Sequence, residues 1–136
     1  MRIVAGCMLA VVALVACSTG SAGPAQASTS LTITYWPDGA NATEKSRWTL
    51  RCAPVGGTLP RPARACKRLM AGGMALFAPV PPRVACTEIY GGPQAARVVG
   101  TFKGKRVFAS FSRGNGCQIS RWQNLSPWLL PPGGVT

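Results

Sequence analysis

The sequence contains no histidine among its 136 residues. Histidine is the usual general base of hydrolases and the commonest ligand of catalytic zinc, so its absence argues against both kinds of site. Acidic residues are scarce as well. There are only three, Asp38, Glu44 and Glu88, and nothing in the sequence brings two of them together for a paired-carboxylate mechanism. We therefore predict that the chain is not an enzyme, has no cofactor or metal, and works by recognition.

Basic residues, in contrast, number 15, which gives a formal net charge of +12 at pH 7. One of them, Arg2, lies in a predicted export signal, and without it the charge is 14 − 3 = +11. A protein with this much positive charge for its size favours acidic partners, such as an acidic protein face, a polyanion or an anionic cell surface.

The first residues have the pattern of an export signal. An apolar run from Ile3 to Ala16 is too short to span a bilayer as a helix, and Ala25-Gln26-Ala27 matches an A-x-A cleavage site. This predicts a signal peptide at 1–27, cleavage before Ser28, and a secreted, extracellular domain at 28–136. A second interpretation stays open: Leu14-Val15-Ala16-Cys17 resembles the bacterial lipobox, which would make 1–16 a lipoprotein signal and anchor the protein at the cell surface through a lipidated Cys17.

Six cysteines are present, and the export signal removes Cys7 and removes or lipidates Cys17. Four cysteines then remain. An even number in an exported chain of this size predicts two disulfides, and the simplest of the three possible pairings joins cysteines that are neighbours in sequence. A zinc site is disfavoured because there is no C-x-x-C pair. The four that remain are Cys52, Cys66, Cys86 and Cys117.

Hydrophobic periodicity predicts an α+β domain. Alternation over 30–36 and 46–54 indicates two strands, with Trp48, Leu50 and Cys52 on one face of the second. Residues 96–113 indicate a hairpin that turns at 103–105, with Val107, Ala109 and Phe111 alternating afterwards. We expect an antiparallel β-sheet of about five strands packed with one or two helices, and two disulfides.

The better helix is predicted at 63–73, where Ala63, Cys66, Leu69 and Met70 fall at helical spacing and Gly72-Gly73 stops it. A second, short helix is expected at 118–125. Residues 55–62 are expected to form a loop, and the tail at 131–136 to be disordered and flexible. The segment at 74–94 is rich in Pro and Gly, and its middle, 84–90, should be extended and exposed.

Three stretches of the chain resemble the Streptomyces subtilisin inhibitor family, small exported protein inhibitors of serine proteases. They are "LRCAPVGGTLPRPARAC", "ACTEIYGGP" and "GKRVFASFSRGNGC". The similarity spans about residues 47 to 118 in order and fades beyond Ile119.

This resemblance implies the pairing Cys52–Cys66 and Cys86–Cys117. It also implies a reactive loop, Cys86, Thr87, Glu88, Ile89 and Tyr90, whose bond Glu88–Ile89 is presented to the protease. Asn115 matches an asparagine whose side chain supports the loop backbone. The expected function is therefore inhibition of an extracellular serine endopeptidase, either subtilisin-like or Glu-preferring.

The chain departs from the family at Glu88, where members more often carry Met or Lys. An acid here either suits a target that accepts acidic residues or weakens inhibition of subtilisin-like enzymes. The alternative function is a cationic extracellular binding module for anionic surfaces or polymers. We expect no nucleic-acid partner and contact with a membrane only through a lipidated Cys17. Since some relatives form dimers through the sheet, a homodimer is also left open.

Overall fold

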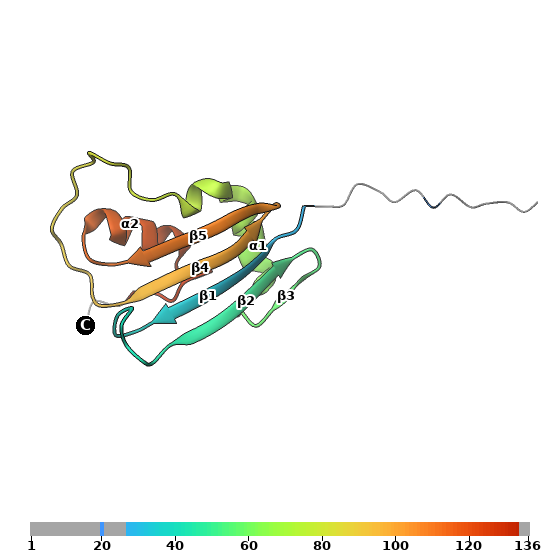
Figure 1. Ribbon diagram of the computed structural model, residues 1–136, viewed down its shortest axis with the longest axis horizontal. Coiled ribbons are helices and arrows are strands. Elements are labelled where there is room, and N and C mark those ends of the chain that lie inside the picture. The colour runs from blue at the N-terminus through green and yellow to red at the C-terminus, as the bar shows by residue number, and fades with distance from the viewer. Residues whose placement is uncertain (1–19, 21–26, 134–136) are drawn as a thin grey trace, which may run out of the picture.

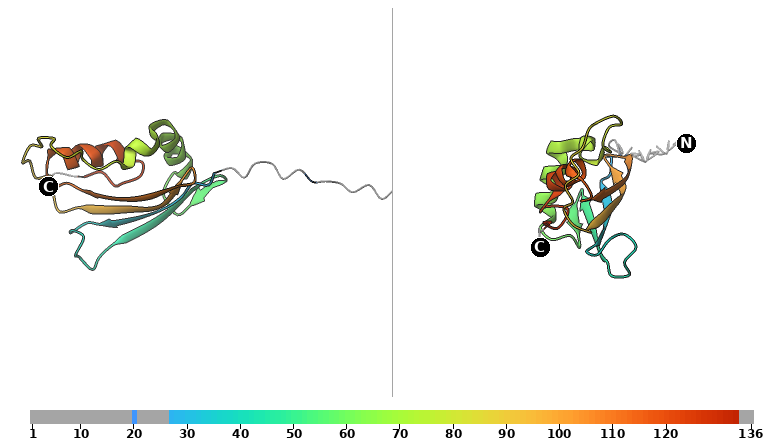
Figure 2. Two further views of the ribbon diagram at one scale, coloured as in Figure 1. Left: turned by 45° about the horizontal axis from the view of Figure 1, so that its top comes forward. Right: turned by 90° about the vertical axis from the view of Figure 1, so that its left-hand side faces the viewer.

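The computed structural model describes residues 20 and 27–133, which form a five-stranded antiparallel sheet with helices on one side (Figures 1 and 2). The predicted fold class is confirmed. The predicted export signal and Cys17 fall almost wholly outside the described residues, and Gly20 and Ala27 are the exceptions. In the order β3-β2-β1-β4-β5, the strands are β3 (Val55–Gly57), β2 (Ser46–Cys52), β1 (Ser30–Trp36), β4 (Ala95–Phe102) and β5 (Lys105–Ser112).

Strand β1 lies at the centre of the sheet because it pairs with β2 on one side and β4 on the other. Its side chains alternate as predicted, so that Leu31 and Ile33 are buried on the helix side. The predicted hairpin is β4–β5. Its two-residue turn has positive φ at both Lys103 (48°) and Gly104 (77°), which a turn matching the twist of the strands requires.

Helix α1 (Pro62–Gly72) confirms the helix predicted at 63–73, shifted by one residue, and the short 3₁₀ helix η1 (Gly73–Phe77) follows it. Proline is tolerated in the first turn, where an N–H would have no partner inside the helix. Of the four residues at helical spacing, Cys66 and Leu69 are buried, whereas Ala63 and Met70 are exposed. The buried side chains of α1 are Ala65, Cys66 and Leu69, and Cys66 is bonded to Cys52 of β2.

Two further expectations need correction. Residues 55–57 are not loop, because they pair with β2 as the short strand β3. The tail is not free at its start either: the carbonyl of Pro131 accepts hydrogen bonds from Trp122 Nε1 (2.9 Å) and Ser126 Oγ (3.3 Å). Residues 134–136 lie outside the described part of the chain.

Helix α2 (Gly116–Leu125) confirms the second helix and begins two residues earlier than predicted. It lies on the helix side of the sheet (Figure 2), where it supplies a large part of the core together with the segment that follows. The buried side chains of this C-terminal part are Trp122, Leu125, Trp128, Leu129 and Leu130.

Both disulfides of the local pairing are present, with Cα–Cα distances of 5.6 Å for Cys52–Cys66 and 5.3 Å for Cys86–Cys117. Within residues 27–133, no helix is long and apolar enough to cross a membrane. The same residues contain no group of three or more His, Cys, Asp or Glu side chains that could hold a metal ion.

Candidate functional site

A long connection runs from the end of η1 to the start of β4 and carries the predicted reactive loop (Figure 1). No helix or strand forms between residues 78 and 94, in agreement with the prediction of an extended segment. The side chains of Thr87, Glu88, Ile89 and Tyr90 are all exposed, with exposed fractions of 63% for Ile89 and 66% for Tyr90. Two large apolar side chains held in water in this way indicate a surface that meets another molecule.

The N-terminal side of the reactive loop is fixed to the start of α2. Cys86 is bonded to Cys117, and the backbone N–H of Gly116 donates to the carbonyl of Thr87 at 2.9 Å. Glycine at 116 permits this approach, because a Cβ there would lie 2.0 Å from Thr87 Oγ1. A covalent bond and a hydrogen bond therefore hold two consecutive loop residues on one helix turn.

The C-terminal side of the loop has its own attachment. The N–H of Gly91 donates to the carbonyl of Arg113 at 2.7 Å, and Gly91 is buried. A Cβ at Gly91 would lie 2.9 Å from the side chain of Ile119, so this contact also needs glycine. Between the two attachments stand only Glu88, Ile89 and Tyr90.

Arg113 supports the same end of the loop through its side chain. It is 6% exposed, and its guanidinium donates to Gln94 Oε1 at 3.1 Å, just before β4. Its guanidinium also lies against the C-terminal segment, since a Cβ at Gly133 would be 2.2 Å from Arg113 Cζ. Sequence reasoning missed this residue, because one arginine among fifteen basic residues carries no sign of burial.

A second arginine, Arg121 of α2, holds the beginning of the long connection. Its Nε donates to the carbonyl of Ala78 at 2.9 Å, and its guanidinium lies over the ring of Phe111 at 4.5 Å. The same group donates to the carbonyl of Ser110 at 3.1 Å and to Gln118 Oε1 at 2.8 Å. Burial lowers the pKa of Arg121 from its ordinary value. The connection is thus tied to α2 and β5 at its start as well as around the reactive loop.

Asn115 lies at the N-terminus of α2, where its Oδ1 accepts a hydrogen bond from the N–H of Gln118 at 3.0 Å. This is an N-cap contact, which satisfies one of the free N–H groups at the start of the helix. The hydrogen bond to the reactive loop comes from the next residue, Gly116. Asn115 therefore touches the helix turn that carries Gly116 and Cys117.

The geometry agrees with the results of sequence and structure comparison. A family model described as "Subtilisin inhibitor-like" matches residues 25–115. The chain belongs to the subtilisin inhibitor-like family. This membership confirms the resemblance found in the sequence, and it agrees with the prediction that the chain is a protease inhibitor and not an enzyme.

Among solved structures, the chain is similar to sermetstatin of Streptomyces caespitosus, crystallised in complex with the subtilisin of Bacillus licheniformis. The sequence identity is 25% and the TM-score 0.51, and the match covers 76% of this chain and 97% of sermetstatin. No curated protein matches the sequence. The family match ends at residue 115, so α2 and the C-terminal segment lie outside it.

Proposed function

We propose that this protein inhibits serine endopeptidases by presenting its reactive loop as a substrate, with Glu88–Ile89 as the bond offered for cleavage. The observation that carries the proposal is the placement of three exposed residues between two backbone hydrogen bonds, beside a disulfide. Sermetstatin, a protein of similar fold, was crystallised with a subtilisin.

An extended loop can dock to a protease as an added strand, with one side chain entering the specificity pocket. Because the loop is already held by Cys117, Gly116 and Arg113, little conformational entropy is lost when it binds. This preorganisation is what distinguishes an inhibitor from a flexible substrate with the same residues.

The two attachments also favour religation of a cut loop. If the bond is cut, the carboxyl end at Glu88 stays bound through Cys86 and Thr87, and the new amine at Ile89 stays bound through Gly91. Held near each other, the two ends have a high effective concentration, so religation competes with release. The cut inhibitor would remain in the protease's active site.

Asn115 acts in this proposal as a positioning residue that works through α2. Its cap stabilises the turn that carries Gly116 and Cys117, and so the place to which the loop is attached. Substitution of a capping residue by alanine typically costs about 1 kcal/mol. We expect Asn115→Ala to weaken inhibition without changing which bond is cut.

Glu88 decides the choice of target. A carboxylate is well matched only by a pocket that offers positive charge or several hydrogen-bond donors, and it carries a desolvation cost in an apolar pocket. We therefore assign the best inhibition to Glu-preferring serine proteases and weaker inhibition to subtilisin-like enzymes.

The test is a set of inhibition constants for the wild type, Glu88→Met and Glu88→Lys against a Glu-preferring protease, subtilisin and trypsin. Glu88→Met should strengthen subtilisin inhibition by about 1 to 3 kcal/mol, or roughly 5- to 150-fold, and Glu88→Lys should favour trypsin. Glu44→Met, an exposed acid in the β1–β2 connection, is the matched control and should change none of the constants. Equal inhibition of subtilisin by all variants would show that Glu88 does not enter the pocket.

The predicted export signal bears on where the inhibitor acts. We propose export with cleavage before Ser28, which gives a secreted, extracellular inhibitor, and lipidation at Cys17 as the alternative that anchors it to the cell surface. The mass of the mature protein from an exporting host distinguishes them, because lipidation adds acyl chains to a polypeptide beginning at residue 17. A protein retained in the cell with residues 1–27 intact would contradict both.

A further inference from the structure

The outer face of the sheet, opposite the helices, is strongly cationic. Here "outer face" means the side chains of β2, β1, β4 and β5 that alternate with the buried ones. In register across β2, β1, β4 and β5, three rows of these side chains run over four strands: Arg47, Thr34, Arg97 and Ser110; Thr49, Thr32, Val99 and Phe108; Arg51, Ser30, Thr101 and Arg106. A fourth row at the end of β1 holds Trp36, Ala95 and Ser112.

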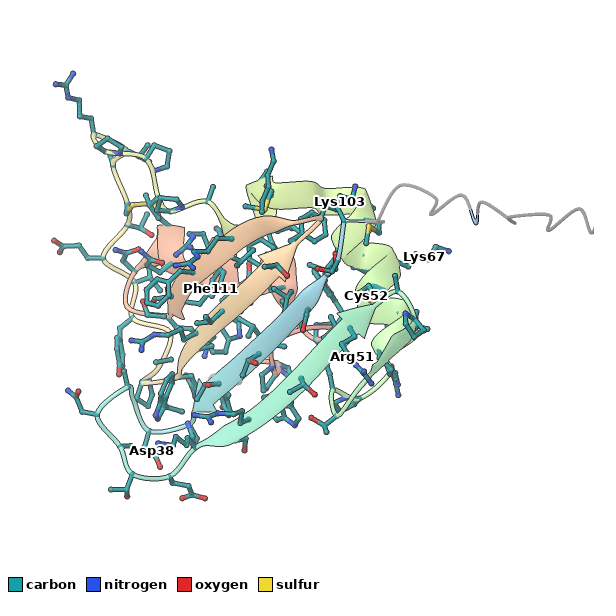
Figure 3. The ribbon with its side chains drawn as sticks, turned by 45° about the vertical axis from the view of Figure 1, so that its right-hand side comes forward. Asp38, Arg51, Cys52, Lys67, Lys103 and Phe111 are labelled. Carbon is teal, nitrogen blue, oxygen red and sulfur yellow. A yellow bond between two sulfur atoms is a disulfide. The ribbon has the colours of Figure 1, made fainter. Side chains whose placement is uncertain are left out.

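Four arginines therefore occupy the first and third of these rows and flank a second row without charge. Arg51, labelled in Figure 3, projects from β2. From the register, the two arginine rows lie four residues apart along β1, or about 13 Å at the usual rise per residue of a strand. Two parallel lines of positive charge thus cross a surface that is otherwise hydroxyl-bearing or apolar.

These charges are not compensated within the fold. All three acidic residues of the sequence lie in connections, Asp38 and Glu44 between β1 and β2 and Glu88 in the reactive loop. In the part of the chain that the structure describes, no carboxylate forms an ion pair with Arg47, Arg51, Arg97 or Arg106. Four guanidinium groups that share one face without an acid favour an anion from outside the protein.

Two aromatic side chains pack against Arg97 of β4. The Arg97 guanidinium lies 5.8 Å from the ring centre of Trp36 and 5.5 Å from that of Phe108, within the range of cation–π attraction. Phe108 is 69% exposed, although it is one of the largest apolar residues of the sheet. A hollow of about 410 Å³ lies among these three residues, Arg47 and Val99. The residues of this cluster come from strands that are far apart in sequence. The cluster could therefore not be predicted from the sequence.

The charge pattern selects the occupant. A second copy packed face to face would oppose four arginines with four arginines and no acid, which is unfavourable. A peptide would find no free backbone in the middle of the sheet, where β1 and β4 are paired on both sides. Guanidinium groups bind phosphate through two parallel hydrogen bonds, which favours a phosphate-bearing ligand. Trp36 and Phe108 already pack against Arg97, which argues against the stacking of nucleic-acid bases on these rings.

From this pattern we infer that the outer face binds a linear phosphate polymer through its charge and independently of any base. The inference does not depend on the proposed function. The reactive loop is attached to α2 on the other side of the sheet, so a protease and a polymer can be bound together. Such binding would retain an exported inhibitor near a phosphate-bearing surface or matrix.

The experiment measures binding of long-chain inorganic polyphosphate to the mature protein by calorimetry over a series of salt concentrations. Arg47→Gln/Arg97→Gln should weaken binding at least about tenfold and reduce the salt slope, by about one for each arginine–phosphate pair that the substitutions remove. The matched control is Arg64→Gln/Arg68→Gln, which removes the same charge from exposed positions of α1. The control should change affinity less than about threefold, and both variants should keep the wild-type inhibition constant.

Three results would overturn the inference. Equal losses in the two variants would mean that the charge acts diffusely and that the outer face is no site. Binding of a single-stranded oligothymidylate but not of polyphosphate would assign the face to base stacking and nucleic acid. A wild-type dimer in sedimentation that Arg47→Gln/Arg97→Gln strengthens or abolishes would assign it to a second copy of the chain.

Discussion

The substitution Gly116→Ala tests how the reactive loop is attached to α2 without changing the core of the fold. The new Cβ would lie 2.0 Å from Thr87 Oγ1 and 3.3 Å from Thr87 Cβ, whereas carbon atoms in contact prefer about 3.5–4.0 Å. Thr87 is β-branched and stiff at χ1, so the clash is relieved mainly by moving the loop backbone away from α2. That movement lengthens the 2.9 Å hydrogen bond from Gly116 to Thr87.

The size of the effect follows from the cost of overpacking. Forcing an extra methyl group into a close contact typically costs about 1–3 kcal/mol, which corresponds to a roughly 5- to 150-fold larger inhibition constant. Alanine favours the helix more than glycine does, and the loop is exposed, so the strain should appear in the loop and not in the core. We expect weaker inhibition with an unchanged or slightly higher Tm.

Two further variants make the test specific. Gly114→Ala is the matched control, because its Cβ meets nothing closer than Ser112 Oγ at 4.0 Å. Thr87→Ala combined with Gly116→Ala removes the clashing oxygen and should restore part of the affinity that the single variant loses, as a coupling energy in a double-mutant cycle. The assay is the inhibition constant for the protease that the wild type inhibits best. If Gly116→Ala inhibits it as well as the wild type does, Gly116 does not position the loop.

Three more predictions concern the supports of the loop and the core of the sheet. Replacing Cys86 and Cys117 by serine should abolish tight inhibition and lower the free energy of unfolding, measured in denaturant, by about 3.7 kcal/mol in the chain-entropy model. Arg113→Met leaves Gln94 Oε1 without its partner and should cost about 1–3 kcal/mol in the same assay, together with faster cleavage of the inhibitor by its target. Burial raises the pKa of Tyr35 above 10.0, so the folded state keeps the proton longer than the unfolded state. The free energy of unfolding should therefore fall as the pH rises above 10.0, and it should fall less steeply in Tyr35→Phe than in the wild type.

Much of the sheet could be predicted from the sequence because alternation is a local signal. Residues 30–36, 46–52 and 105–112 each turn alternate side chains towards the helices, although in 46–52 only Leu50 is fully buried. The Lys103-Gly104 turn has a local chemical cause. Strand β3 escaped prediction because two of its three residues are glycine, so it has almost no side-chain pattern and exists through pairing with β2. In α1, helical spacing alone did not separate the buried Cys66 and Leu69 from the exposed Ala63 and Met70, because burial depends on where the helix meets the sheet.

The reactive loop could be placed from the cysteines and the flanking residues that resemble the family, but its supports could not. Arg113 and Arg121 hold the connection through contacts with Gln94, Ala78 and Ser110, which are far from them in sequence. The role of Gly116 depends on a distance to Thr87, which no pattern of residue types encodes.

Cleavage by the target protease tests the central claim most directly. The wild-type domain is incubated with the protease it inhibits, acidified, and its mass is measured before and after reduction. Because the bond Glu88–Ile89 lies inside the loop closed by Cys86–Cys117, the cut form should gain the mass of one water molecule and stay in one piece. Reduction should then release two fragments, one ending at Glu88 and the other beginning at Ile89. A first cut at any other bond during inhibition would contradict the account of the reactive loop.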